Sequence, residues 1–182
     1  MKKWLMMLGI TSMIVAAGCG SNTEEDSSTS GDSDNNNSEE SSNDETATKK
    51  EILNIQQEMV STFRPEQSQI ADYEAAIGAE KPDEEAIKDA GEAAKSAAAN
   101  AATKVEQFSI EGDLSNKIKE QYEKALPSLQ AYYEEVETAL DESLTEADLT
   151  EADKKFEEFQ DQVSTIYEEA DLLSTNLKSE FS

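Results

Sequence analysis

Acidic side chains are the most numerous groups in this sequence that could do chemistry. The chain has 182 residues, of which 41 are Asp or Glu and 15 are Lys or Arg, so its formal net charge is -26. Neighbouring carboxylates can serve as general acid and base when burial separates their pKa values. Most acid pairs here fall opposite the apolar residues of their segments, which favours a solvated surface. The four pairs are Glu84-Glu85, Glu134-Glu135, Glu157-Glu158 and Glu168-Glu169.

Cation binding is a second use for carboxylates. Glu157 and Asp161 are four residues apart, so on a helix they share one face and could bind Ca²⁺ or Mg²⁺ together with acids of a neighbouring helix. Loose accumulation of counterions around the acidic surface is the competing interpretation. We therefore expect no cofactor and no dedicated metal site, and Glu157 and Asp161 are the candidates for one.

The composition excludes several classes of function. The chain has no His, so imidazole-based catalysis and imidazole metal sites are excluded. It has one Cys, so it forms no internal disulfide and no zinc knuckle. The strong negative charge repels phosphates, so nucleic acid is not an expected partner.

The single cysteine stands at the end of an N-terminal apolar segment. Lys2 and Lys3 precede an apolar run from Trp4 to Ala17, and Gly18-Cys19 follows it. A charged start, a short apolar stretch and small residues at its end are typical of an export signal. The run is also shorter than the roughly 20 residues that a membrane-spanning helix needs.

The residues Val15-Ala16-Ala17-Gly18-Cys19 resemble the lipobox of bacterial lipoproteins, with Ala16 where Leu is commonest. The resemblance implies a signal peptide at residues 1–18, a diacylglyceryl group on Cys19, and cleavage just before this cysteine. It implies a lipid-anchored protein at the extracytoplasmic face of the cell membrane, since two acyl chains are enough for stable attachment. The alternative is an ordinary secretion signal in which the cysteine is incidental.

Residues 19–48 have the composition of a tether. After Cys19 the segment is rich in Ser, Asn, Thr and acids, and contains no Lys, no Arg and no side chain more apolar than Ala47. Such a segment cannot bury enough apolar surface to offset the entropy of ordering. We therefore expect an acidic, disordered linker between the lipidated cysteine and a folded domain.

Residues 49–182 have the pattern of one all-α domain. Good helix formers dominate, and apolar residues recur every three or four positions in four segments joined by short connections. This predicts an antiparallel up-down bundle of about four helices. The first three stripes are Ile52, Ile55, Met59, Phe63, Ile70, Tyr73 and Ile77; Ile87, Ala90, Ala94, Ala97, Ala101, Val105 and Phe108; and Leu114, Ile118, Tyr122, Leu126, Leu129, Val136 and Leu140.

Details of these helices are also predicted by the sequence. Pro65 should kink the first helix or break it in two. Of Tyr132 and Tyr133, one should face the core and the other should be partly exposed. Thr145 is the expected N-cap of the last helix, which should be one coiled-coil-like element. Its stripe is Leu149, Ala152, Phe156, Phe159, Val163, Ile166, Ala170, Leu173 and Leu177.

The arrangement of a lipidated cysteine, a polar linker and a Glu- and Lys-rich helical body resembles the cell-wall-binding helical lipoproteins of Gram-positive bacteria. The most similar part runs from about Leu126 to Phe181. The resemblance implies a non-enzymatic lipoprotein that binds a protein partner or a cell-wall component. Two alternatives stay open: a cation- or small-ligand-binding lipoprotein that serves a transporter, and a hydrolase that uses two carboxylates. Binding to an anionic wall polymer should depend on divalent cations, because two polyanions repel.

Overall fold

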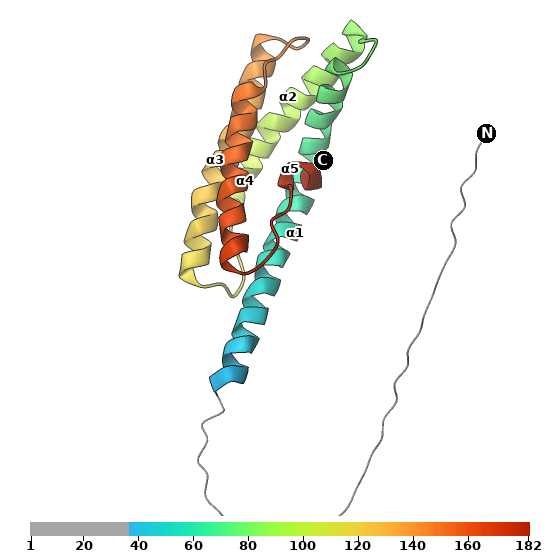
Figure 1. The fold of residues 1–182 in the computed structure, drawn as a ribbon. Helices are drawn as coiled ribbons and strands as arrows, with labels where there is room; N and C mark the ends of the chain where they lie inside the picture. The colour runs from blue at the N-terminus through green and yellow to red at the C-terminus, as the bar shows by residue number, and fades with distance from the viewer. Residues whose placement is uncertain (1–36) are drawn as a thin grey trace, which may run out of the picture. The chain divides into compact units, whose positions relative to one another are not determined.

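The computed structural model describes residues 37–182, with side chains described from residue 44 onward. The signal peptide, Cys19 and residues 20–36 of the predicted linker lie outside the described residues. The described part contains helices and no strand, which confirms the all-α prediction (Figure 1). Its elements are α1 (Asn37–Ile77), α2 (Glu84–Gln107), α3 (Asn116–Glu142), α4 (Thr150–Glu169) and α5 (Leu177–Phe181).

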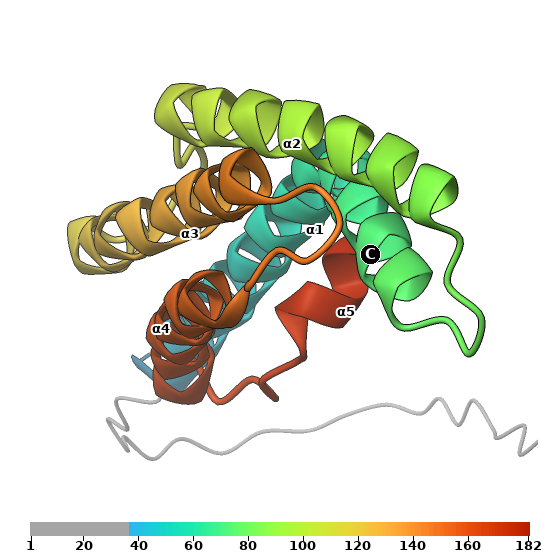
Figure 2. The same cartoon turned by 90° about the horizontal axis from the view of Figure 1, so that it is seen from above.

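The four long helices run alternately up and down, as the short connections predict (Figure 1). The main packing pairs are α1 with α2, α2 with α3, α3 with α4, and α1 with α5. Figure 2 shows the short helix α5 lying between α1 and α4, where a regular four-helix bundle would have its fourth interface. The C-terminal segment therefore completes the bundle on that side.

The helix boundaries are partly those expected from local chemistry. Asp83 is the N-cap of α2, and its carboxylate accepts hydrogen bonds from the backbone N–H groups of Glu85 and Ala86. Ser115 caps α3 in the same way by accepting from the Ile118 N–H. Pro65 lies inside α1, which is a single helix, so the expected alternative of a break at this proline is wrong.

The first helix begins earlier than composition predicts. Composition predicts a disordered linker through residue 48, yet α1 starts at Asn37. Starting a helix is costly, but each residue added to an existing helix gains one hydrogen bond per residue fixed. The packed part of α1 supplies the nucleus, so a polar sequence that is a poor helix former by itself extends it.

The fourth helix is shorter at both ends than its apolar spacing predicts. It begins at Thr150, with Leu149 at the N-cap position, so the prediction that Thr145 caps it is wrong. The Asp148 carboxylate instead accepts from the N–H and hydroxyl of Thr150. These bonds close the turn that precedes α4, and they hold the pKa of the exposed Asp148 below its usual value.

At its other end α4 stops at Glu169, so the predicted continuous helix to Leu177 is also wrong. The Leu172 N–H donates to the Tyr167 carbonyl at 2.8 Å, and the Asp171 N–H donates to the Glu168 carbonyl at 3.1 Å. These two bonds form a Schellman motif, with Asp171 at the left-handed position that glycine usually occupies (φ 49°). Leu173 lies beyond this turn and is 92% exposed.

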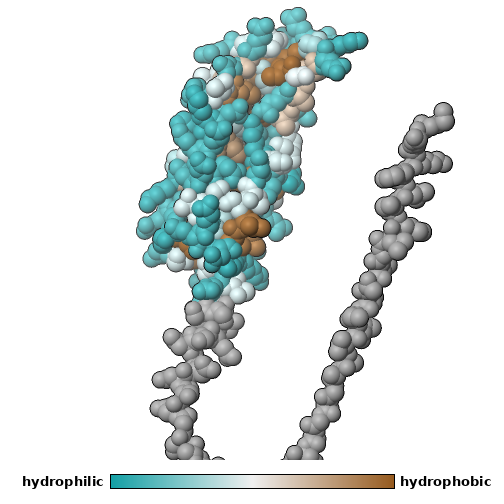
Figure 3. Space-filling view, in the orientation of Figure 1, coloured by the Kyte–Doolittle hydropathy of each residue, from teal (hydrophilic) through white to brown (hydrophobic). Residues whose placement is uncertain are grey.

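The interior is filled with aromatic side chains, as the stripes predict. Tyr132 and Tyr133 are both buried, so the expectation that one of them is partly exposed is wrong. Both fit because Tyr132 packs edge-on against Phe156 of α4 while Tyr133 packs against Phe63 of α1. The outer surface in the view of Figure 3 is mostly hydrophilic, with a few separate hydrophobic patches.

Candidate functional site

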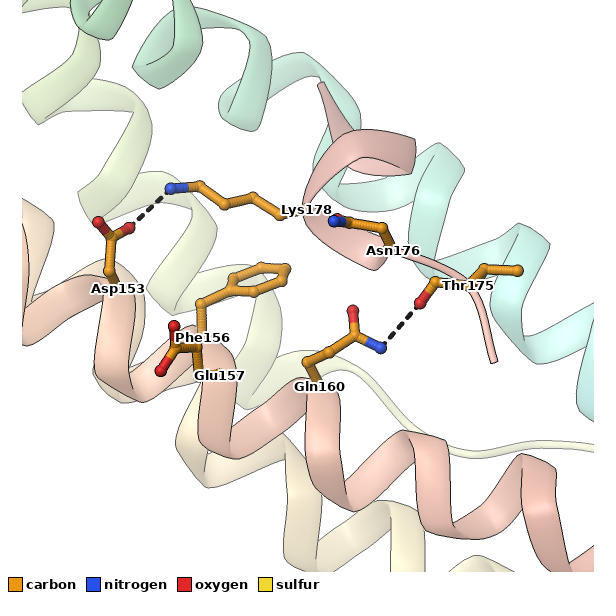
Figure 4. A pocket seen from close by; sticks show the side chains of 7 residues that line it. All are labelled: Asp153, Phe156, Glu157, Gln160, Thr175, Asn176 and Lys178. Carbon is orange, nitrogen blue, oxygen red and sulfur yellow. Dashed lines mark hydrogen bonds and ion pairs between the residues drawn. The ribbon is translucent and has the colours of Figure 1, made fainter. Parts of the chain in front are cut away.

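One surface hollow lies between α4 and the C-terminal segment. It is a groove of about 490 Å³, which we call the C-terminal groove. Figure 4 shows its side chains facing one another across the gap, with the Phe156 ring between the two walls. The residues that line it are Asp153, Phe156, Glu157 and Gln160 of α4, and Thr175, Asn176 and Lys178 of the C-terminal segment.

The helical repeat brings the α4 wall together. Residues 153, 156, 157 and 160 are spaced by three and four positions, so they form one strip along the helix. Phe156 is almost fully buried and belongs to the core, whereas Asp153 and Glu157 are exposed. The wall is therefore an acidic rim above an aromatic base.

Gln160 holds the opposite wall in place. Its amide Nε2 donates to the Thr175 carbonyl at 2.8 Å, and its Oε1 accepts from the Leu177 N–H at 2.8 Å. One side chain thus satisfies two backbone groups of the segment that leads into α5. Asn176 then caps α5, because its Oδ1 accepts from the Ser179 N–H at 3.0 Å.

Lys178 is the cation of the groove. Its Nζ lies 2.7 Å from Asp153 Oδ1, 3.1 Å from Glu74 Oε1 and 5.9 Å from the centre of the Tyr132 ring. Partial burial works against the charged form, but the hydrogen bond to Asp153 and the charge of Glu74 outweigh it, so the pKa of Lys178 is raised. Lys178 therefore stays charged at neutral pH and ties α5 to both α1 and α4.

A second groove, of about 580 Å³, lies at the other end of α4, beside the N-terminal turns of α1 and the start of α3. Lys117 Nζ and Gln121 Nε2 both donate to Glu169 Oε2 there, at 2.7 and 3.1 Å. These hydrogen bonds lower the pKa of Glu169, which is exposed. The groove is lined by Asp44, Glu45, Thr48, Lys49, Ser115, Lys117, Ile118, Ile166, Glu169, Ala170 and Asp171.

The structure places the two candidate cation ligands, Glu157 and Asp161, on one exposed face of α4. Glu157 lines the C-terminal groove and Asp161 lies one turn further along α4, both exposed. Within residues 44–182, no group of three or more acidic or cysteine side chains is arranged to hold a metal ion. All eight residues of the four acid pairs are exposed. Cys19, the predicted lipidation site, lies outside the described residues.

Sequence reasoning missed Gln160, Asn176 and Lys178. Their roles depend on the chain folding back after α4, and the uninterrupted apolar spacing concealed that turn. Asn176 followed by an apolar residue was the one local signal of a new helix start.

None of the helices in residues 37–182 is long and apolar enough to cross a membrane.

Neither a protein-family model nor a curated protein or solved structure matches this chain.

Proposed function

We propose that this chain is a non-enzymatic lipoprotein, anchored through Cys19 at the extracytoplasmic face of the membrane, whose helical bundle binds a protein partner. The C-terminal groove carries the proposal for binding. It joins an aromatic base at Phe156, the exposed carboxylate of Glu157, the Asp153–Lys178 ion pair, and amides at Gln160 and Asn176. A protein surface with a basic side chain next to an apolar one matches that lining.

The charge of the bundle supports a protein partner over a wall polymer. Acidic residues outnumber basic ones by 41 to 15 in the chain, and Glu157 is exposed at the groove. A wall polymer that carries phosphates is repelled by such a surface, unless divalent cations bridge carboxylate to phosphate. A basic protein is attracted by it, and the attraction speeds association more than it strengthens the complex.

The lipid anchor rests on the lipobox-like residues that end at Cys19 and is tested separately from binding. Cells that express the Cys19→Ala variant are labelled with a fatty-acid analogue, and their membranes are washed and probed for the chain. Loss of the lipid label together with loss of cleavage, or with release from the membrane, supports the anchor. A shortened, processed Cys19→Ala chain that stays on washed membranes contradicts it.

Binding at the groove is tested with a photo-crosslinking amino acid in intact cells. The probe replaces Thr175 at the groove in one chain and Ala93, which is exposed on α2, in a matched control. We expect a specific adduct from Thr175 and none from Ala93. A Glu157→Lys change should reduce the adduct, while Glu92→Lys, the same change of charge on α2, should leave it intact. Equal losses from both changes would mean that only net charge matters.

The wall polymer is the alternative outcome of a second assay. Purified chain is mixed with isolated wall sacculi, with Mg²⁺ and then with excess chelator. Retention only with Mg²⁺, without a groove-dependent protein adduct in cells, would replace the protein partner with a cation-bridged wall polymer. Absence of retention under both conditions, together with the Thr175 adduct, supports the protein partner.

A further inference from the structure

The C-terminal segment, residues 171–182, packs between α1 and α4 as a bound peptide would. We call this segment the latch. Phe181 is fully buried, with its ring centre 5.9 Å from that of Phe63 of α1 and 6.0 and 6.5 Å from those of Phe156 and Phe159 of α4. Leu177, one turn earlier, is also fully buried. Two apolar anchors four residues apart are typical of a short helix seated in a groove.

The polar contacts of the latch are equally specific to its sequence. Lys178 reaches acids on both walls, Glu74 and Asp153. The Glu180 carboxylate accepts from Gln56, and the Glu180 carbonyl accepts from Arg64 at 2.6 Å. Positive charge of the latch meets negative charge of the groove, and its acidic residue meets donors. The surface between α1 and α4 is therefore complementary to residues 177–181. Another copy of this chain carries the same segment and would fit the same surface.

The turn that sends the latch into its own groove is strained. Asp171 adopts φ 49°, in the left-handed region where a side chain costs energy that glycine avoids. Only residues 172–176, which lie outside any helix, separate this turn from α5, which begins at Leu177. Short connections under strain favour exchange of the element that follows them between two copies of a protein.

The sequence of this turn is also compatible with a straight helix. The apolar spacing of α4 continues through Ala170, Leu173 and Leu177, and residues 170–181 contain no Gly and no Pro. Leu173, which would continue the stripe, is 92% exposed in the folded-back form.

We propose that the latch exchanges between two copies of this chain: α4 straightens at Asp171, and each latch occupies the α1–α4 groove of the other copy. The exchanged dimer keeps the contacts of residues 177–181 described above, replaces the turn hydrogen bonds of Asp171 and Leu172 with helical ones, and removes two left-handed Asp171 residues. It requires neither the lipid nor a foreign partner, so it goes beyond the proposed function and can fail independently of it.

Two substitutions at Asp171 bias the equilibrium in opposite directions. Glycine adopts the left-handed turn without strain, so Asp171→Gly favours the folded-back monomer. Alanine is the best helix former, so Asp171→Ala favours the straight helix of the exchanged dimer. Ala and Gly differ about five-fold in helix formation per residue, and a dimer has two hinges, so the two dissociation constants should differ by at least about 25-fold. Light scattering after gel filtration of the full chain, over a range of concentrations, measures this difference.

Chemical crosslinking distinguishes exchange from any other dimer. On a Cys19→Ser background, one preparation carries Gln56→Cys and another carries Glu180→Cys, and the two are mixed, partly unfolded in urea, refolded together and treated with a bismaleimide. Exchange places the two thiols of different chains next to each other, so a mixed covalent dimer forms. In the control, Ala93→Cys on the exposed face of α2 replaces Gln56→Cys and should give no product.

The outcomes are decisive in both directions. Mixed dimers from residues 56 and 180, with more dimer for Asp171→Ala than for Asp171→Gly, support exchange. A dimer that forms without the mixed crosslink, or with equal amounts for the two variants, overturns it. So does a monomer for all chains at the highest soluble concentration, provided that circular dichroism shows each variant to be folded.

Discussion

The helix α4 and the latch that follows it carry the same apolar spacing, yet they form different structures. Positions 152, 156, 159, 163 and 166 form the buried face of α4. Beyond the end of α4, Leu173 is exposed, and Leu177 is buried in the separate helix α5. The difference arises at Asp171, where two backbone hydrogen bonds end α4. Apolar spacing thus indicates which face of a helix is buried, but it does not indicate where the helix ends.

The largest expected loss of stability comes from Phe181, the last apolar anchor of the latch, and it tests how the latch differs from α4. Phe181→Ala removes a fully buried ring that contacts both α1 and α4. Truncation of such a ring typically costs about 3–5 kcal/mol. Leu173→Ala changes the stripe residue that is exposed and should cost less than about 0.5 kcal/mol. Urea unfolding measures both, and equal losses would mean that the latch does not seat as described.

The sequence predicts more of the fold than of the site. Stripe residues such as Met59, Leu129 and Val163 are buried as expected, because burial of apolar surface dominates folding and has a simple period. Asp83 also caps its helix as predicted, because a cap needs only residues close in sequence. Fold class and helix faces follow from these local rules.

The rest could not be predicted because it depends on contacts distant in the chain. Gln160 meets Leu177 only after the turn at Asp171, and Lys178 meets Glu74 from across the bundle. A left-handed Asp has no strong sequence signal, since glycine is the usual residue there. Likewise, α1 extends to Asn37 because packing elsewhere nucleates it. Cys19 could be predicted from its motif and stays a prediction.

Two buried tyrosines differ in whether the hydroxyl has a hydrogen-bond partner among the described residues. Gln67 Nε2 donates to the Tyr132 hydroxyl at 2.8 Å, whereas the Tyr122 hydroxyl has no hydrogen-bond partner among the described residues. Tyr132→Phe leaves the buried Gln67 amide unsatisfied and should cost about 1–3 kcal/mol. Tyr122→Phe removes a hydroxyl that forms no bond and should change stability by less than about 1 kcal/mol. Thermal and urea unfolding measure both changes in stability. A larger loss for Tyr122→Phe than for Tyr132→Phe would contradict the prediction.

The same tyrosines predict loss of stability at high pH. Burial raises the pKa of Tyr132 to about 12, and it also raises the pKa values of Tyr122 and Tyr167. Below the unfolded pKa of about 10, both folded and unfolded chains keep these protons, so stability does not change. Above it the unfolded chain releases protons that the folded chain retains, so the free energy of unfolding falls by about 1.4 kcal/mol per pH unit for each group.

The Tyr122→Phe variant measures how much one tyrosine contributes to this loss of stability at high pH. Tyr122→Phe should reduce the steepness between about pH 10 and 12 by the contribution of one proton, about 1.4 kcal/mol per pH unit. Its urea unfolding curve at pH 8 should match that of the parent chain to within about 1 kcal/mol. An unchanged steepness would mean that the Tyr122 hydroxyl reaches solvent.

The smallest expected effect concerns the outer face of α4, the counterpart of its buried stripe. Glu157 and Asp161 are exposed there, and the described residues supply no third acid arranged with them around a cation. Ca²⁺ in proteins takes six to eight oxygen ligands, so two exposed carboxylates leave most of its shell to water.

Paired Glu157→Gln and Asp161→Asn changes should shift stability by less than about 0.5 kcal/mol. Added Ca²⁺ should move the thermal midpoint of the double variant and the parent chain equally, because general screening of acidic charge acts on both. A midpoint shift confined to the parent chain would identify a cation site at these two residues and revive the cation-binding alternative.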